Sequence, residues 1–327
     1  MSTRASTAAL RLTVTVGLLL ILLFVVADPG EIIALVSNIT LIPFLGAVLL
    51  STADRFLMAY KWWLLLRSRN LGVRLWTAFR CYLVSSLYGL ILPVTVGADA
   101  IRILAIRQLG ITEVAASIII ERGLGVLAMG SVALLSSLLL ATSVSSVQVE
   151  SLTLWLTIGI AIMVVAFTAS LHFANRWALR KKSDNKPRLR KAAEAYARYR
   201  LHPGLLAVFY LLSVVESLLS AVIVYVVALG LGISLPLYIF VATVPLALAS
   251  ARLPISLGGF GVQEASFVFL AGLLGVPNAT SLTIMLIADV AMLIALLPAL
   301  LDSSMLTLRQ RAKEDADALD SHGFKDE

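Results

Sequence analysis

The sequence predicts an all-α polytopic membrane protein, an inverted repeat of two halves, each with three spanning helices and one re-entrant helical hairpin. Three observations predict this fold. The 327-residue chain is 60% hydrophobic and only 14% charged, with a mean hydropathy of +0.96, which is too apolar for an ordinary soluble domain. A short phrase centred on Leu-Pro occurs twice, about half the chain apart. Lysine and arginine residues gather in some connections and are missing from others.

Apolar segments of sufficient length define the spans, since a hydrocarbon core of about 30 Å requires roughly 20 helical residues. We predict six full spans, at residues 11–27, 39–60, 113–141, 151–173, 204–229 and 279–301. Two further apolar segments, at 76–110 and 237–275, are interrupted by the repeated phrase and are predicted to be the hairpins. The chain therefore divides into a first membrane half at 1–145, a second at 146–303 and a cytoplasmic, unstructured tail at 304–327.

The repeated phrase marks both interruptions. Leu92-Pro93-Val94-Thr95-Val96-Gly97 returns 161 residues later as Leu253-Pro254-Ile255-Ser256-Leu257-Gly258. Glycine and proline breaks at corresponding positions of two apolar halves are typical of transporters built from internal repeats. The repeat also favours retention of the first span, because residues 11–27 correspond to 151–173, although cleavage of a signal peptide remains an alternative.

The distribution of basic residues predicts the orientation. No Lys or Arg occurs in the connections near residues 28–38, 142–150, 230–236 and 276–278. Five occur at 61–80 and ten at 176–200. Because such residues accumulate on cytoplasmic loops, we expect a bacterial inner-membrane protein with both termini in the cytoplasm. The two broken segments then enter from opposite faces as hairpins. Pairs of short spans would preserve the same orientation and remain an alternative.

Segment 176–200 is the most basic part of the chain. Its ten Lys and Arg residues face only Asp184 and Glu194, a net charge of +8 within a chain of net charge +7. Basic segments next to spans bind anionic lipid surfaces at about 1 kcal/mol per residue. We therefore expect this loop to contact anionic lipid, and the simpler interpretation is that it only sets the orientation.

Ionisable side chains within the apolar segments are candidate functional residues, because an unpaired charge is costly at the bilayer centre. At the first break we assign Gly97, Asp99 and Arg102 to substrate binding, together with Glu121 and Arg122 of the following span. The helix after the break would direct its N-terminus, which favours anions, toward the midplane. The alternative is internal pairing, with Asp99 as a helix cap and Arg102 as its partner.

At the second break, Arg252, Gly258, Gly259 and Glu264 receive the same assignment. Two helix N-termini and two arginines would then meet an anionic headgroup near the midplane. The alternative for Glu264 is an ion pair with Arg252 across its own hairpin.

Asp54 and Glu216 occupy corresponding positions, 162 residues apart, in the second span of each half. They are the candidates for proton coupling. Asp54 and Arg55 are sequence neighbours, and so are Glu121 and Arg122. Neighbours on a helix point in different directions, so we expect each of these four charges to require a separate partner.

Other classes of function are disfavoured. Cys81 is the single cysteine, and the three histidines (His172, His202 and His322) have no metal-ligand spacing. No phosphate-binding loop or nucleophile elbow occurs. We therefore expect no metal, cofactor or nucleic-acid partner and no enzymatic activity. An intramembrane enzyme that uses Asp99, Glu121 or Glu264 as acid and base is the weakest alternative.

Two runs of residues carry a resemblance to a known family. The first comprises Tyr82, Leu87-Tyr88, Leu92-Pro93, Gly97-Ala98-Asp99-Ala100, Arg102 and Glu121-Arg122-Gly123. The second runs from Leu253 through Gly258-Gly259-Phe260-Gly261 to Glu264. Over about residues 10–302 the chain resembles the membrane region of lysylphosphatidylglycerol synthases.

In that family the membrane region translocates lipid, and some members carry a separate aminoacyl transferase domain. Other members accompany hopanoid or cell-surface glycan pathways. Two positions depart from the family's pattern: Ala98 replaces a frequent glycine, and Asp289 stands where an arginine is expected. The reversed charge at Asp289 argues against the family's cationic lipid as substrate. Without a transferase domain, this chain is not expected to make aminoacylated lipid.

These observations together predict a flippase that moves a phosphate-bearing lipid, anionic or polyprenyl-linked, by alternating access. The alternative is a non-catalytic membrane scaffold or accessory subunit of a lipid, hopanoid or cell-surface glycan pathway. The scaffold hypothesis predicts association with a biosynthetic enzyme and tolerance of substitutions at the buried charges.

Overall fold

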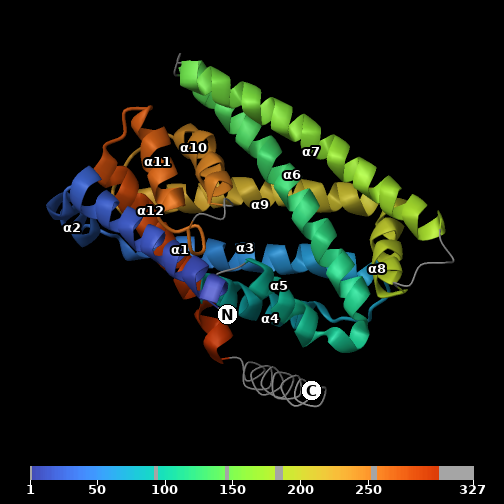
Figure 1. Ribbon diagram of the computed structural model, residues 1–327. Helices are drawn as coiled ribbons and strands as arrows, with labels where there is room; N and C mark the ends of the chain where they lie inside the picture. The colour runs from blue at the N-terminus through green and yellow to red at the C-terminus, as the bar shows by residue number, and fades with distance from the viewer. Residues whose placement is uncertain (1, 92–94, 144–146, 181–186, 252–255, 302–327) are drawn as a thin grey trace.

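The computed structural model describes residues 2–91, 95–143, 147–180, 187–251 and 256–301, which are almost entirely helical (Figure 1). The first half contains α1 (Ser2–Ile21), the π-helix η1 (Leu22–Val26), α2 (Pro29–Ser37), α3 (Leu41–Arg67), α4 (Leu75–Ile91), α5 (Thr95–Ala105), η2 (Arg107–Leu109) and α6 (Ile111–Ser143). The second contains α7 (Val147–Arg180), α8 (Pro187–Ala197), η3 (Arg198–Leu201), α9 (Pro203–Gly230), α10 (Leu237–Ser250), α11 (Val262–Gly272), α12 (Asn278–Leu296) and η4 (Leu297–Leu301).

Helices correspond to all six predicted spans. Within the described residues, five helices are long and apolar enough to cross a membrane: Leu41–Arg67, Ile111–Thr142, Thr153–Trp177, Pro203–Gly230 and Asn278–Leu300. Leu10–Val26 and Pro29–Ser37 meet at 90° and add a sixth span if this bent pair crosses the membrane as one. The protein is therefore an all-α, multi-pass membrane protein.

The bend in the first span has a local cause. Asp28 is the N-cap of α2, and its Oδ1 accepts a hydrogen bond from the Gly30 amide at 2.8 Å. Pro29 occupies the first helical position, where its missing N–H costs nothing. A new helix therefore starts where the sequence predicted only a connection.

Helix α3 extends beyond its predicted end at residue 60. It continues to Arg67, so Lys61 lies inside the helix and is only 5% exposed. The expectation that Lys61 belongs to the basic connection at 61–80 is wrong. The apolar run Trp62–Leu66 follows Lys61 and continues the buried face, because Trp62, Leu65 and Leu66 are all fully buried.

Both broken segments form pairs of packed helices, α4 with α5 and α10 with α11. The α4–α5 pair packs against Trp62 and Leu66 near the end of α3. The α10–α11 pair packs in a cluster that includes Ala47, near the start of α3. The two pairs thus lie at opposite ends of this helix (Figure 1). The division into halves 1–145 and 146–303, the inverted relation between them, and re-entry from opposite faces remain predictions, and the tail at 304–327 lies outside the described residues.

Glycine is required in the loop that leads into α11. Gly259 has φ +89°, and a Cβ there would lie 2.8 Å from the Cβ of Ala251. Gly261 has φ +84°, and a Cβ there would lie 2.9 Å from the Cβ of Leu18 on α1. At both positions a residue with a Cβ is excluded, because φ is positive and because the Cβ would collide with a neighbouring side chain. These glycines therefore allow the end of α10 and the first span to approach the loop.

Helices α6 and α7 form a long pair (Figure 1). Gly123 of α6 receives the ring of Phe167, because a Cβ at this glycine would lie 2.6 Å from Cε2 of that ring. On the other side of α7, Trp155 and Phe173 are about 70% exposed. A helix with its large apolar side chains outside is suited to lipid rather than water.

Segment 176–200, predicted to be a loop, contains helix α8 and the turn η3. Tyr199 anchors it, since this residue is fully buried and its hydroxyl donates to the carbonyl oxygen of Leu65 at 3.1 Å. Burial raises the pKa of Tyr199 above its ordinary value, so the hydroxyl stays protonated as a donor. The basic side chains described here that are exposed are Arg176, Arg190, Lys191, Arg198 and Arg200.

Candidate functional site

A cavity of about 750 Å³ occupies the centre of the bundle. Its walls come from α3, α4, α6, α9, α10 and α12, with the loop before α11, one residue of α11 and one residue of α1. Four basic side chains line it: Arg11, Arg55, Lys61 and Arg122. Four acidic side chains line it as well: Asp54, Glu121, Glu216 and Asp289. A cavity lined by charged side chains inside helices of this hydropathy is typical of a substrate pathway.

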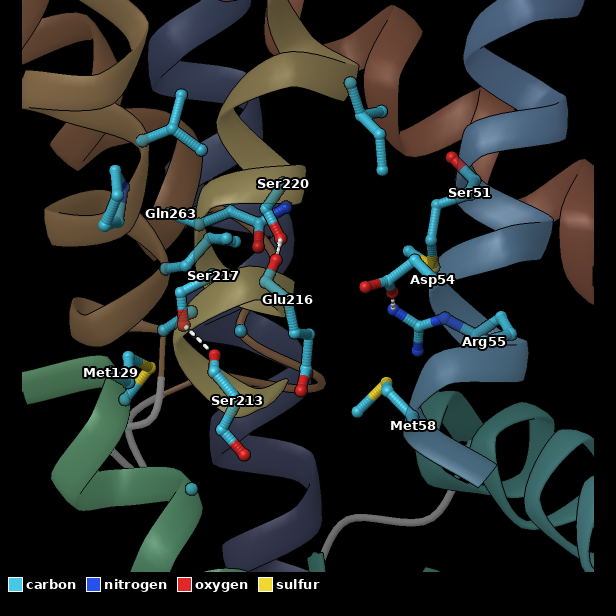
Figure 2. Close-up of a pocket in the computed structure, with 18 of the residues that line it drawn as sticks. Ser51, Asp54, Arg55, Met58, Met129, Ser213, Glu216, Ser217, Ser220 and Gln263 are labelled. Atoms are coloured by element: carbon cyan, nitrogen blue, oxygen red, sulfur yellow. Dashed lines mark hydrogen bonds and ion pairs between the residues drawn. The ribbon is translucent and has the colours of Figure 1, made fainter. Parts of the chain in front are cut away.

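Helices α3 and α9 supply two facing walls. Figure 2 shows Asp54 and Arg55 on α3 across the cavity from Glu216 on α9. Lys61 donates to Glu216 and also to the Ser213 hydroxyl, 2.9 Å from its Nζ. The corresponding carboxylates Asp54 and Glu216 therefore reach one cavity, and their role in proton coupling stays a prediction.

Asp54 and Arg55 pair with each other, with Nη2 2.7 Å from Oδ2. The expectation that these neighbours need separate partners is wrong for this pair. The arginine side chain is long enough to turn back along the helix surface to the preceding residue. Glu121 and Arg122 follow the expectation, because Glu121 contacts Arg102 and Arg122 contacts Asp99.

Arg102 forms the centre of a buried network between α5 and α6. Its Nη2 lies 2.6 Å from Asp99 Oδ1, and its Nη1 lies 2.6 Å from Glu121 Oε2. The guanidinium also lies against the rings of Trp62 and Tyr82, about 5 Å from each centroid. With this side chain 3% exposed and outside the cavity lining, the internal pairing that the sequence allowed describes Arg102 better than a headgroup contact.

Asp99 is also placed differently from the cap proposed for it. Helix α5 begins at Thr95, so Asp99 lies in the second turn rather than at the start. Its carboxylate joins Arg102 and Arg122, with Oδ1 2.9 Å from Nη2 of Arg122. Asp99 therefore fixes the two arginines and does not line the cavity.

The second break supplies another part of the cavity wall. Ser256, Gly258 and Gly259 line the cavity there. Glu264 is fully buried, and its Oε2 accepts the Gly261 amide at 2.5 Å. The N-terminus of α11 is thus occupied by its own third residue, half of a capping box, instead of being open to an anion.

Several buried polar atoms at the cavity have no hydrogen-bond partner in the described part of the chain. They are Ser51 Oγ, Asp54 Oδ1, Arg55 Nε, Ser256 Oγ and Asp289 Oδ2. Buried polar atoms are nearly always hydrogen-bonded, so such a group of orphans around one space indicates a polar occupant, either water or a ligand.

The structure brings some predicted site residues together and separates others. Six of them line the cavity: Asp54, Glu121, Arg122, Glu216, Gly258 and Gly259. Gly97 lies in the first turn of α5, while Asp99, Arg102 and Glu264 are set behind the lining. Arg252 lies outside the described residues, and its role remains a prediction.

The polar lining residues that sequence reasoning did not assign to the site include Ser51, Lys61 and Gln263. Lys61 had a signal, since the apolar run Trp62–Leu66 continues the helix beyond it. For the other two the sequence offers no comparable signal. No group of three or more His, Cys, Asp and Glu side chains placed to hold a metal ion occurs among the residues that the structure describes.

Comparison with known proteins agrees with this architecture. A family model described as the lysylphosphatidylglycerol synthase TM region matches residues 9–299. The match includes both breaks and every residue that lines the cavity, so the resemblance noted in the sequence is confirmed. No curated protein gives a significant match to the chain.

Proposed function

This chain belongs to the lysylphosphatidylglycerol synthase transmembrane-region family, and from that premise we propose that it is a lipid flippase. It moves the headgroup of a phosphate-bearing lipid, anionic or polyprenyl-linked, across a bacterial inner membrane, with both termini in the cytoplasm. Transport follows alternating access, in which the walls of the cavity open to one side of the membrane at a time.

The observation that carries this proposal is the central cavity with its charged lining. A volume of about 750 Å³ lies within the range of roughly 300–1,000 Å³ typical of small-molecule sites. It suits a headgroup, while the tails remain in the bilayer beside the apolar helices. Such charges are costly in a membrane and are retained where a polar substrate passes.

Two arginines of the lining are the best phosphate ligands. Arg55 keeps its Nε without an acceptor among the described residues, although it is paired with Asp54. The side chain of Arg122 is 39% exposed beside the cavity. Guanidinium groups bind phosphate oxygens through charge-assisted hydrogen bonds, and the Ser51 and Ser256 hydroxyls supply further donors.

A cavity-filling variant tests the proposal without removing a charge. Gly125 lines the cavity, and a Cβ added there would have no described atom within 4 Å. Gly125→Phe therefore places a ring in the cavity with little strain on the helix. Gly159 of α7 has the same free space and lies outside the lining, so Gly159→Phe is the matched control.

The assay is lipid scrambling in proteoliposomes, with fluorescent phospholipids and an undecaprenyl-phosphate-type probe. We expect scrambling with the wild type and Gly159→Phe, and the rate of protein-free vesicles with Gly125→Phe. Full activity of a folded Gly125→Phe variant would contradict the assignment of the cavity. If no probe moves with folded wild-type protein, the transporter proposal fails, and the scaffold hypothesis is then tested by co-purification with lipid or glycan enzymes.

A further inference from the structure

Two carboxyl groups meet beside the cavity, at the contact between α11 and α12. Glu264 of α11 and Asp289 of α12 accept hydrogen bonds from the same side-chain amide. The side-chain amide of Gln263 bridges them, with Nε2 2.7 Å from Asp289 Oδ1 and 3.2 Å from Glu264 Oε1. Glu264 has no exposed surface, so this contact is shielded from bulk solvent.

The pair differs from the other acidic residues of the membrane segments. Ion pairs among the described residues include Asp54, Asp99, Glu121 and Glu216, and none of these pairs includes Glu264 or Asp289. When two carboxylates share one donor in a buried site, like-charge repulsion disfavours the state in which both are ionised. A single shared proton removes this repulsion and leaves one negative charge for the Gln263 and Gly261 donors.

The proton also explains an orphan atom. Asp289 Oδ2 is buried and has no hydrogen-bond partner in the described residues. If one carboxyl of the pair is protonated, Asp289 Oδ2 either carries that proton as a donor or accepts a hydrogen bond from the protonated Glu264. Asp289, Gln263 and Ser256 line the same cavity, and Ser256 is 7% exposed with an Oγ that lacks a described partner. The pair therefore borders a polar space through which a proton can arrive or leave by way of water.

Other ionisable groups face this space from the neighbouring elements. They are Arg11 of α1, Asp54, Arg55 and Lys61 of α3, Tyr82 of α4, Glu121 and Arg122 of α6, and Glu216 of α9. Asp54 pairs with Arg55 and Glu216 with Lys61, so these two carboxylates already have compensating cations. The Glu264–Asp289 pair is thus better suited to proton exchange than the residues that the sequence suggested.

We propose that Glu264 and Asp289 together bind one proton, exchange it with the cavity, and so couple lipid movement to protons. Loss of the proton puts two like charges at the contact between α11 and α12 and favours their separation. The protonation state then biases the equilibrium between conformations of the cavity. This inference rests on the proposed flippase function for its coupling step, whereas proton binding is testable independently.

Infrared spectroscopy of the purified full-length protein tests proton binding. We expect a protonated-carboxyl C=O band at neutral pH that shifts in D₂O and is lost in Asp289→Asn and in Glu264→Gln. Either substitution leaves one carboxyl to take the single negative charge. Asp54→Asn is the matched control and keeps the band, because Asp54 is paired with Arg55.

Three results would overturn proton binding by the pair. They are absence of the band in the wild type, persistence of the whole band in Asp289→Asn, and a band that emerges only in Arg252→Ala. The last result would mean that Arg252, which lies outside the described residues, neutralises the pair.

The coupling step is tested by lipid scrambling as a function of pH. We expect the wild-type rate to change with pH, and this dependence to be lost in Asp289→Asn whatever rate remains. A wild-type rate independent of pH contradicts coupling. If the infrared band behaves as expected and no lipid moves, the flippase proposal fails while proton binding stands.

Discussion

Replacement of Arg102 is the sharpest test of the buried network, because the sequence and the structure give this residue different roles. As a headgroup ligand, Arg102 would be needed for transport and dispensable for folding. As the centre of the network, it joins α5 to α6 through Asp99 and Glu121. Arg102→Ala should therefore destabilise the protein in the absence of any lipid substrate.

The size of the effect follows from the partners that remain. Asp99 keeps Arg122, whereas among the described residues Glu121 keeps only the Tyr82 hydroxyl, 2.9 Å from its Oε1. Removal of one partner of a buried ion pair costs about 3–5 kcal/mol. Since Asp99 remains paired, we expect a loss in the free energy of unfolding near the lower figure, about 3 kcal/mol.

Unfolding of the purified variants in detergent measures this loss. The double variant Arg102→Ala/Glu121→Gln should recover part of the stability, because it removes the orphaned charge. Arg122→Ala should cost less, since the Arg122 side chain is 39% exposed and that of Arg102 only 3%. If Arg102→Ala unfolds like the wild type and only transport is lost, the network reasoning is refuted and Arg102 contacts the lipid.

Two further substitutions probe close helix contacts. Gly123→Leu should destabilise the α6–α7 pair by about 1–3 kcal/mol, because the new side chain occupies the place of the Phe167 ring. Restored thermal stability in Gly123→Leu/Phe167→Ala would support this, and no effect of the first substitution would contradict it. Gly261→Ala should lower thermal stability, since φ is +84° and Leu18 is in the way. Unchanged stability in detergent would show that α1 does not pack there as described.

The positions of the spans and breaks were predictable from the sequence because they depend on local properties. Apolar length determines which segments can cross a bilayer, and the two Leu-Pro phrases interrupt helices wherever they are placed. Even so, Lys61 was assigned to a connection, because the predicted span ended just before this residue. The burial of Lys61 depends on Glu216 of α9, which no local pattern indicates.

The partners of the buried charges were much less predictable. Sequence reasoning gave Arg102 and Glu264 equal standing as ligands around the two breaks. In the structure, Arg102 links α5 to α6 through an ion pair with Glu121. Glu264 instead accepts a hydrogen bond from the Gly261 amide at the N-terminus of its own helix. Asp289 was noted as a departure from a family pattern, and its contact with Gln263 gives it a candidate role in proton exchange.

The sequence by itself determined the class of the protein, the helices that cross the membrane, the two breaks and the family. Hydrophobic length and helix-breaking residues act within a segment, so these features can be predicted from the linear sequence. Only the tertiary structure decided which charges neutralise one another and which face the cavity. A charge inside a membrane finds its partner on whichever helix packs against it, and here Lys61 and Glu216 are 155 residues apart.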